Sequence, residues 1–127
     1  RATVHGVSTA RSLPMTHFVS SLNALAAAVP DGSRIAIPPD YSGVALAASR
    51  ALIARAAREL RLVAVPQAGF QADLLIGAGC VASIETAGIN LGEYGLAPRY
   101  TAAIEGGEVR IIDATCPAVH AGLQAAE

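Results

Sequence analysis

The sequence predicts an α/β protein, built on an open, mostly parallel sheet with helices on both faces in Rossmann-like layers. Segments of strand and helix character alternate along the chain, which is typical of such folds. The strand-like segments are continuous apolar runs, as expected for strands that are buried on both sides. The length of 127 residues suits a single domain.

The first half of the chain supplies two predicted helices and two predicted strands. Apolar residues at helical spacing predict a helix over 16–29, closed by the turn at 30–32. A short strand over 34–37 follows and ends at two prolines, which cannot donate to a strand ladder. Residues 44–60 are almost all helix formers with an apolar half, so this helix should lie on the sheet next to a second strand at 62–65.

The second half continues the alternation. Short segments rich in Leu and β-branched residues predict three further strands, at 73–76, 81–86 and 109–112. A long loop is expected over 88–98 and one or two helical turns over 99–105. Pro117 fits the first position of a last helix.

Residues 16–127 are expected to form one partial domain. Residues 1–15 show no helical or strand period and end at the only methionine, so we expect an arm or a non-native extension there. The helical pattern is still running at Glu127, which indicates that the domain continues beyond it.

The composition indicates a soluble subunit that buries surface against a partner. Charged residues make up 15% of the chain, against about a quarter in an ordinary soluble domain. Hydrophobic residues make up 53%, mostly aliphatic, and this excess favours an oligomer. Every apolar run is broken before the roughly 18 residues that a membrane-spanning helix needs. The cytoplasm is the expected location, because there is no signal-peptide pattern and two cysteines make no disulfide framework.

The basic residues give no sign of a nucleic-acid partner. All nine are arginines, they are spread along the chain, and the net charge is −1. Neither nucleic acid nor anionic lipid is therefore expected to bind.

Ligands of open parallel sheets bind beyond the carboxyl ends of the strands. The segments expected there are 38–43, 77–80, 88–98 and 113–120. In the first, Ser42 and Gly43 open a predicted helix, whose free amides attract phosphate or carboxylate. The alternative is that Ser42 is only a helix cap.

Gly77 and Gly79 belong to a G-x-G-x-x-A pattern that is typical of dinucleotide-binding turns. The residues that follow look like a strand instead of a helix, and Arg99 stands near the place of the ribose-binding acid. A tight turn between two strands is favoured over a cofactor site, and no cofactor is expected.

Two further places carry candidate chemistry. Glu93, in a glycine-flanked loop, could orient a substrate, pair with Arg99, or stay solvated. Cys116 precedes a helix start, where the dipole favours a thiolate, and His120 lies one turn on as a possible base. A buried small hydrophobe beside a hydrogen-bonded histidine is the favoured interpretation of this pair. No metal is expected, because the rest of the sequence offers no second His or Cys pair at ligand spacing that could complete a site with these two residues.

Several short motifs follow one another in order along residues 17–112. They are Val29-Pro30-Asp31-Gly32, Ser42-Gly43-Val44, Arg61-Leu62-Val63, the run from Ala72 to Gly79, Val81, Ile84-Glu85-Thr86, and the run from Gly92 to Tyr100. Their order and spacing resemble the A-type subunits of class I coenzyme A transferases. The resemblance implies a coenzyme-A-transferase-like fold and exchange of coenzyme A between an acyl-CoA and a carboxylate, through a glutamyl thioester on a B-type partner subunit.

No residue of this chain matches the motif of that glutamate. No catalytic residue is therefore expected here, coenzyme A is a substrate moiety, and the chain should be inactive without its partner in a hetero-oligomer. The expected substrate-binding residues are Tyr41, Ser42, Gly43, Gly77, Gly79 and Glu93.

One departure from the family concerns the turn after the first strand. A-type subunits often carry Gly-Gly-Phe there, with amides that face the thioester oxygen, whereas this chain has Pro38 and Pro39, which lack N–H groups. One such donor can lower a barrier by about 3 kcal/mol. Either Tyr41, Ser42 or the Gly43 amide replaces it, or the substrate binds differently, or the subunit is silent. Acyl-CoA hydrolysis, and a module that only binds CoA esters or sugar phosphates, remain alternatives.

Overall fold

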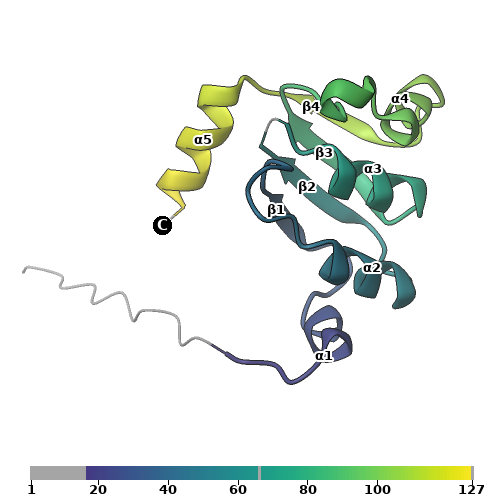
Figure 1. Cartoon of the computed structure of the whole chain (residues 1–127), viewed down its shortest axis with the longest axis vertical. Coiled ribbons are helices and arrows are strands. Elements are labelled where there is room, and N and C mark those ends of the chain that lie inside the picture. The colour runs from purple at the N-terminus through teal and green to yellow at the C-terminus, as the bar shows by residue number, and fades with distance from the viewer. Residues whose placement is uncertain (1–16, 66, 127) are drawn as a thin grey trace, which may run out of the picture.

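The computed structural model describes residues 17–65 and 67–126. Among these residues, four strands form one sheet in the order β1-β2-β3-β4, with all neighbours parallel (Figure 1). The strands are β1 (Arg34–Ile37), β2 (Leu60–Ala64), β3 (Val81–Thr86) and β4 (Arg110–Asp113). The parallel sheet confirms the predicted α/β fold. The expected arm at 1–15 lies outside the described residues.

Within the same ranges, five α-helices and one 3-10 turn accompany the strands. They are α1 (Leu22–Ala27), α2 (Leu46–Ala54), α3 (Phe70–Gly77), η1 (Gly92–Tyr94), α4 (Pro98–Glu105) and α5 (Cys116–Ala125). Helices α1 to α4 pack on one face of the sheet, and α5 lies over the other (Figure 1). The prediction of helices on both faces is confirmed.

The main core lies between the sheet and helices α1 to α4. Alternate strand residues point into this core. Its largest fully buried side chains, each 2% exposed or less, are Ile37, Leu60, Leu62, Leu75 and Ile84. Full burial of one such side chain stabilises the fold by about 1.5–3 kcal/mol. A second cluster joins α5 to the other face, through Val119 and Leu123 against Val63 and Val65.

The predicted strand at 73–76 is wrong, because these residues belong to helix α3. The apolar part of this segment is only the three residues 74–76, and so short a run does not distinguish a buried strand from a buried helix by its period. The buried residues of α3 lie at helical spacing: Gln71 and Ala72 are followed four positions later by Leu75 and Ile76. The helix can be apolar on most of its surface because it packs between the sheet and helices α2 and α4.

Helices α1 and α2 are shorter than predicted. Helix α1 starts after Ser21, whose hydroxyl accepts a hydrogen bond from the Ala24 amide at 3.1 Å. Helix α2 ends at Ala54 instead of reaching residue 60, because the chain turns back through Ala56 and Glu59, with φ of +56° and +57°. Such left-handed conformations are unfavourable for residues with side chains and end a helix.

Within the described ranges, none of the helices has the length and apolarity to cross a membrane.

Candidate functional site

Three loops meet at the end of the sheet where the strands finish, and we call residues 38–45, 67–69 and 87–97 the carboxyl edge. Asp40, after β1, accepts hydrogen bonds from the amides of Gly69 and Phe70 at 3.1–3.2 Å, and its own amide donates to the Gln67 carbonyl at 3.1 Å. Gly69 lies so near the third loop that a Cβ there would stand 2.0 Å from the Asn90 carbonyl oxygen. These contacts fix the loops relative to one another.

Asp40 also closes a potential anion site. The amides of Gly69 and Phe70 lie at the start of α3, where a phosphate or carboxylate would otherwise be attracted. The chain's own carboxylate fills that place. Asp73 does the same for α4 by accepting from the amides of Arg99 and Tyr100 at 2.8 and 2.9 Å.

The turn at residues 38–43, after β1, leaves two backbone donors free despite its prolines. The Ser42 amide donates to the Pro39 carbonyl at 2.9 Å, and the Asp40 amide donates to the Gln67 carbonyl. The amides of Tyr41 and Gly43 make no hydrogen bond to any other described residue. They are therefore available to an oxygen of a ligand at the carboxyl edge.

Ser42 and Gly43 do not open helix α2 as predicted. The helix begins at Leu46, and its N-cap is Ala45. Gly43 has a φ of +78°, a left-handed conformation that delays the helix. Ser42 is thus neither a helix cap nor part of a helix N-terminus, but both residues remain exposed at the carboxyl edge.

Gly77 and Gly79 lie at the opposite end of the sheet from the carboxyl edge. They end α3 and lead into β3, with Gly79 at a φ of +69°, so the turn joins a helix to a strand and not two strands. A dinucleotide turn needs the reverse order, strand before helix. Gly77 serves packing, because a Cβ there would stand 2.8 Å from Cγ of Arg99.

Glu93 lies in η1, exposed at the carboxyl edge. Of the three roles left open for it, pairing with Arg99 does not occur, because the ion pairs of the described residues are Arg34 with Glu85 and Arg55 with Asp31. Large apolar side chains surround this edge. Those at least 46% exposed are Tyr41, Phe70, Tyr94 and Leu96. Such an exposed group is typical of a surface that contacts a ligand or a partner.

Cys116 and His120 are both exposed on α5, so the favoured interpretation of a buried cysteine is wrong. No hydrogen bond joins the two among the described contacts. Cys80 is the buried cysteine, and burial raises the pKa of its thiol. Groups of three or more His, Cys, Asp or Glu side chains that could hold a metal are absent from the described part of the chain.

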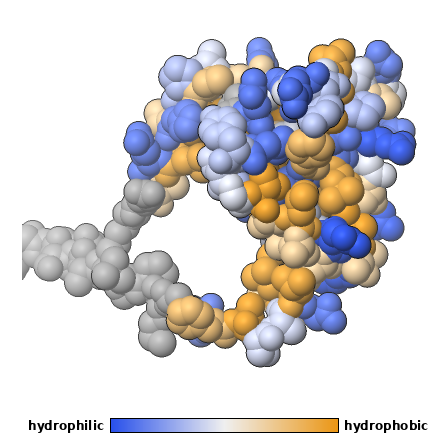
Figure 2. Space-filling model, in the orientation of Figure 1, coloured by the Kyte–Doolittle hydropathy of each residue, from blue (hydrophilic) through white to orange (hydrophobic). Residues whose placement is uncertain are grey.

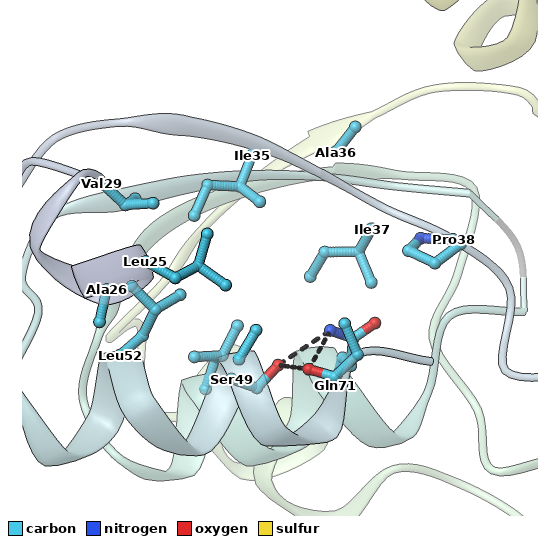
Figure 3. A pocket seen from close by; sticks show the side chains of 13 residues that line it. Leu25, Ala26, Val29, Ile35, Ala36, Ile37, Pro38, Ser49, Leu52 and Gln71 are labelled. Carbon is cyan, nitrogen blue, oxygen red and sulfur yellow. Dashed lines mark hydrogen bonds between the residues drawn. The ribbon is translucent and has the colours of Figure 1, made fainter. Parts of the chain in front are cut away.

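An apolar groove of about 210 Å³ runs between α1, β1, α2 and α3 (Figure 3). Its lining is Leu25, Ala26, Val29, Ile35, Ala36, Ile37, Pro38, Ala45, Ala48, Ser49, Leu52, Gln71 and Leu75. Pro38 and Ala45 belong to the carboxyl edge, so the groove reaches the candidate site. Figure 2 shows an apolar band, in orange, from the middle of the molecule down to α1.

Two buried polar residues lie in the wall of this groove. The amide nitrogen of Gln71 donates to the Ser49 hydroxyl at 2.8 Å and to the Ala45 carbonyl at 3.4 Å (Figure 3). Gln71 Oε1 is buried and has no hydrogen-bond partner among the described residues. An unmade bond of this kind costs about 1–3 kcal/mol. Sequence reasoning missed the pair, and its only signal was one uncharged polar residue in each of two largely apolar helices.

No model of a known protein family matches the chain, and no curated protein matches it. Among solved structures, the chain is similar to the crystal structure of the decarboxylase AibA/AibB, determined as a variant with serine in place of a cysteine. The identity is 27% and the TM-score 0.67, over 76% of this chain and 38% of that chain. The match therefore spans well under half of the solved chain.

This likeness agrees with the parallel sheet and confirms the predicted fold, an α/β sheet of the coenzyme A transferase type. It relates the chain to an enzyme that is named for two components.

Proposed function

We propose that the chain is an A-type subunit of an acyl-CoA:carboxylate coenzyme A transferase, and that it forms part of the acyl-CoA site. The observation that carries the proposal is the carboxyl edge itself, where three loops converge beside two free amides and an apolar groove. The amides of Tyr41 and Gly43 would donate to the thioester oxygen in place of the glycines that Pro38 and Pro39 replace.

The groove would hold the acyl chain. Its volume of about 210 Å³ lies below the roughly 300–1,000 Å³ of sites for drug-sized ligands, which favours a short acyl group. Its lining is almost wholly apolar, and the free Oε1 of Gln71 would accept a hydrogen bond from a hydroxyl on the acyl chain.

The nucleophile would come from a B-type partner. Of the carboxylates at the carboxyl edge, Asp40 is engaged as a cap, and Glu93 is exposed and makes no ion pair with another described residue. The partner's glutamate would attack the thioester carbonyl of the acyl-CoA, expel the thiolate of coenzyme A and form a mixed anhydride. The thiolate would then attack the glutamyl carbonyl of the anhydride, which leaves a glutamyl thioester and releases the first carboxylate. The acceptor carboxylate would run the same two steps in reverse, so one thioester is broken and one is formed overall, and no oxidant or reductant is needed.

The test is reconstitution with the B-type subunit that the proposal requires, which is to be sought in the reading frames next to that of this chain. An acyl-CoA and an isotopically labelled acceptor carboxylate are supplied to the chain, to the partner and to their mixture. Only the mixture should form labelled acyl-CoA, and mass spectrometry should find coenzyme A bound to the partner. Turnover by the isolated chain, or none by the mixture, would contradict the proposal. Free coenzyme A without transfer would indicate hydrolysis instead.

A variant of the groove tests its role. Ala48→Leu fills the groove, so we expect KM for the acyl-CoA to rise by about 10-fold or more, since poor fit in an apolar pocket weakens binding by 1–3 kcal/mol. Ala47→Leu is the control, because Ala47 is exposed on the same helix and does not line the groove. Equal KM values for the two variants would place the acyl chain elsewhere.

Decarboxylation is the second candidate, because the solved structure is named a decarboxylase. In this case the mixture would release CO₂ from an acyl-CoA whose acyl group bears a second carboxylate. The same reconstituted mixture separates the two functions: CO₂ release without labelled acyl-CoA favours decarboxylation.

A cytoplasmic location stays a prediction.

A further inference from the structure

Three arginines and a serine form one row across the sheet face opposite helices α1 to α4. The strand register pairs Arg34 with Arg61, Arg61 with Ser83, and Ser83 with Arg110. Arg61 stands between Leu60 and Leu62, which point into the core, so its side chain points to the other face. We call these four residues the arginine row; neighbouring strands are about 4.8 Å apart, so it spans about 14 Å.

The charges of the row are not balanced within the described chain. Glu85 follows Ser83 by two residues in β3, so it lies on the same face, and it forms an ion pair with Arg34. Arg61 and Arg110 are exposed and have no ion pair among the described residues. Like charges directly opposite each other on neighbouring strands destabilise a sheet. The row is thus unfavourable for the isolated chain.

The surface beside the row is apolar and hollow. Ile112, on the same face, is 39% exposed. A hollow of about 200 Å³ lies between Arg34, Arg61, Ser83, Glu85 and Ile112. A second hollow of about 370 Å³ separates the end of α5 from Val63 and the Arg34–Glu85 pair. Parallel sheets normally have both faces covered, and α5 covers only part of this one.

We propose that this face docks a helix of the partner subunit that carries carboxylates for Arg61 and Arg110 and apolar side chains for Ile112 and the hollow beside it. Charge complementarity selects this occupant. A second copy of the chain, docked symmetrically, would set the positive row against itself. In its choice of partner, this inference rests on the proposed function.

The test measures the affinity of the B-type subunit for this chain by calorimetry. Arg61→Glu combined with Arg110→Glu should weaken binding by at least about 10-fold, because it opposes like charges at the contact. Arg50→Glu is the matched control, since Arg50 is an exposed arginine of α2, on the opposite side of the sheet, and should change affinity less than about 2-fold. Circular dichroism and a thermal melt show whether each variant is folded.

A milder pair, Arg61→Gln with Arg110→Gln, tests the row if the reversed variant fails to fold. It should weaken binding and reduce the loss of affinity that added NaCl causes in the wild type. Unchanged affinity and salt dependence in the variants would overturn the docking inference while leaving the proposed function intact. Failure of the wild-type chain to bind the B-type subunit at all would overturn both.

Discussion

Leu62 and Arg61 are neighbours in strand β2, yet Leu62 is 1% exposed beneath helices α1 to α4, whereas Arg61 stands exposed on the opposite face of the same sheet. The covered face is a packed apolar core, and its buried polar side chains are Ser49, Gln71 and Thr86. The other face carries the arginine row and an exposed Ile112. One face therefore stabilises the fold by burial, and the other is the face that we propose for docking.

The largest expected contrast between the faces is in packing. Ile84→Ala should lower the free energy of unfolding by about 2–5 kcal/mol, because Ile84 is 0% exposed in the core. Ile112→Ala should lower it by at most about 1 kcal/mol, because Ile112 is 39% exposed on the other face. Urea denaturation measures both. Equal losses would show that the second face is packed as well as the first.

The next largest effect concerns Asp40, which ties the carboxyl edge to helix α3 on the covered face. Asp40→Ala removes the acceptor for two amides, one of which belongs to the buried Gly69, so we expect a loss of about 1–3 kcal/mol in unfolding free energy. Glu93→Ala, an exposed carboxylate of the same edge, is the control and should change little. A loss no greater than that of the control would mean that the loops are held by other contacts.

A smaller effect of opposite sign is expected on the other face. Arg61→Thr should raise the free energy of unfolding of the isolated chain by about 0.2–1 kcal/mol, because it relieves repulsion from Arg34 across the strand pair. Arg61→Lys keeps the charge and should not stabilise. The gain should shrink at high salt, where repulsion is screened. If Arg61→Thr instead lowered the free energy of unfolding, Arg61 would be making favourable contacts within the isolated chain.

The smallest effect is a pH dependence at the turn before β1. Hydrogen bonds from the Arg58 amide, and then from Arg55, hold the pKa of Asp31 below its ordinary value of 3.8. A carboxylate with a lowered pKa stabilises the fold above its unfolded pKa, and this contribution is lost as the pH falls through the folded value. Thermal melts from pH 5 downward should therefore show a shallower decline for Asp31→Asn. Identical declines would argue against the assignment.

The sequence predicted strands well where apolar runs have clear ends. The bounds 34–37 and 81–86 agree with β1 and β3, because prolines end one and glycines flank the other. Residues 73–76 form part of helix α3 and not the predicted strand, because the three apolar residues 74–76 are too few to show a period. That single error moved Gly77 and Gly79 to the wrong end of the sheet.

The site was predicted in outline only. The loop after β1 and the loop around Glu93 do lie at the carboxyl edge, as the rule for parallel sheets requires. The Ser49–Gln71 pair and the arginine row were missed for one reason. Both depend on residues far apart in the sequence, and strand register is not visible in it, so arginines that form a row appeared to be spread along the chain.

Hydrogen exchange of this chain, in complex with the proposed B-type subunit, shows whether the carboxyl-edge loops bind the CoA ester. Addition of a CoA ester should slow exchange in residues 38–45 and 87–97, at the carboxyl edge, and leave the turn at 106–109, at the other end of the sheet, unchanged. Protection confined to that turn, or none in the carboxyl-edge loops, would contradict the claim that these loops bind the ester.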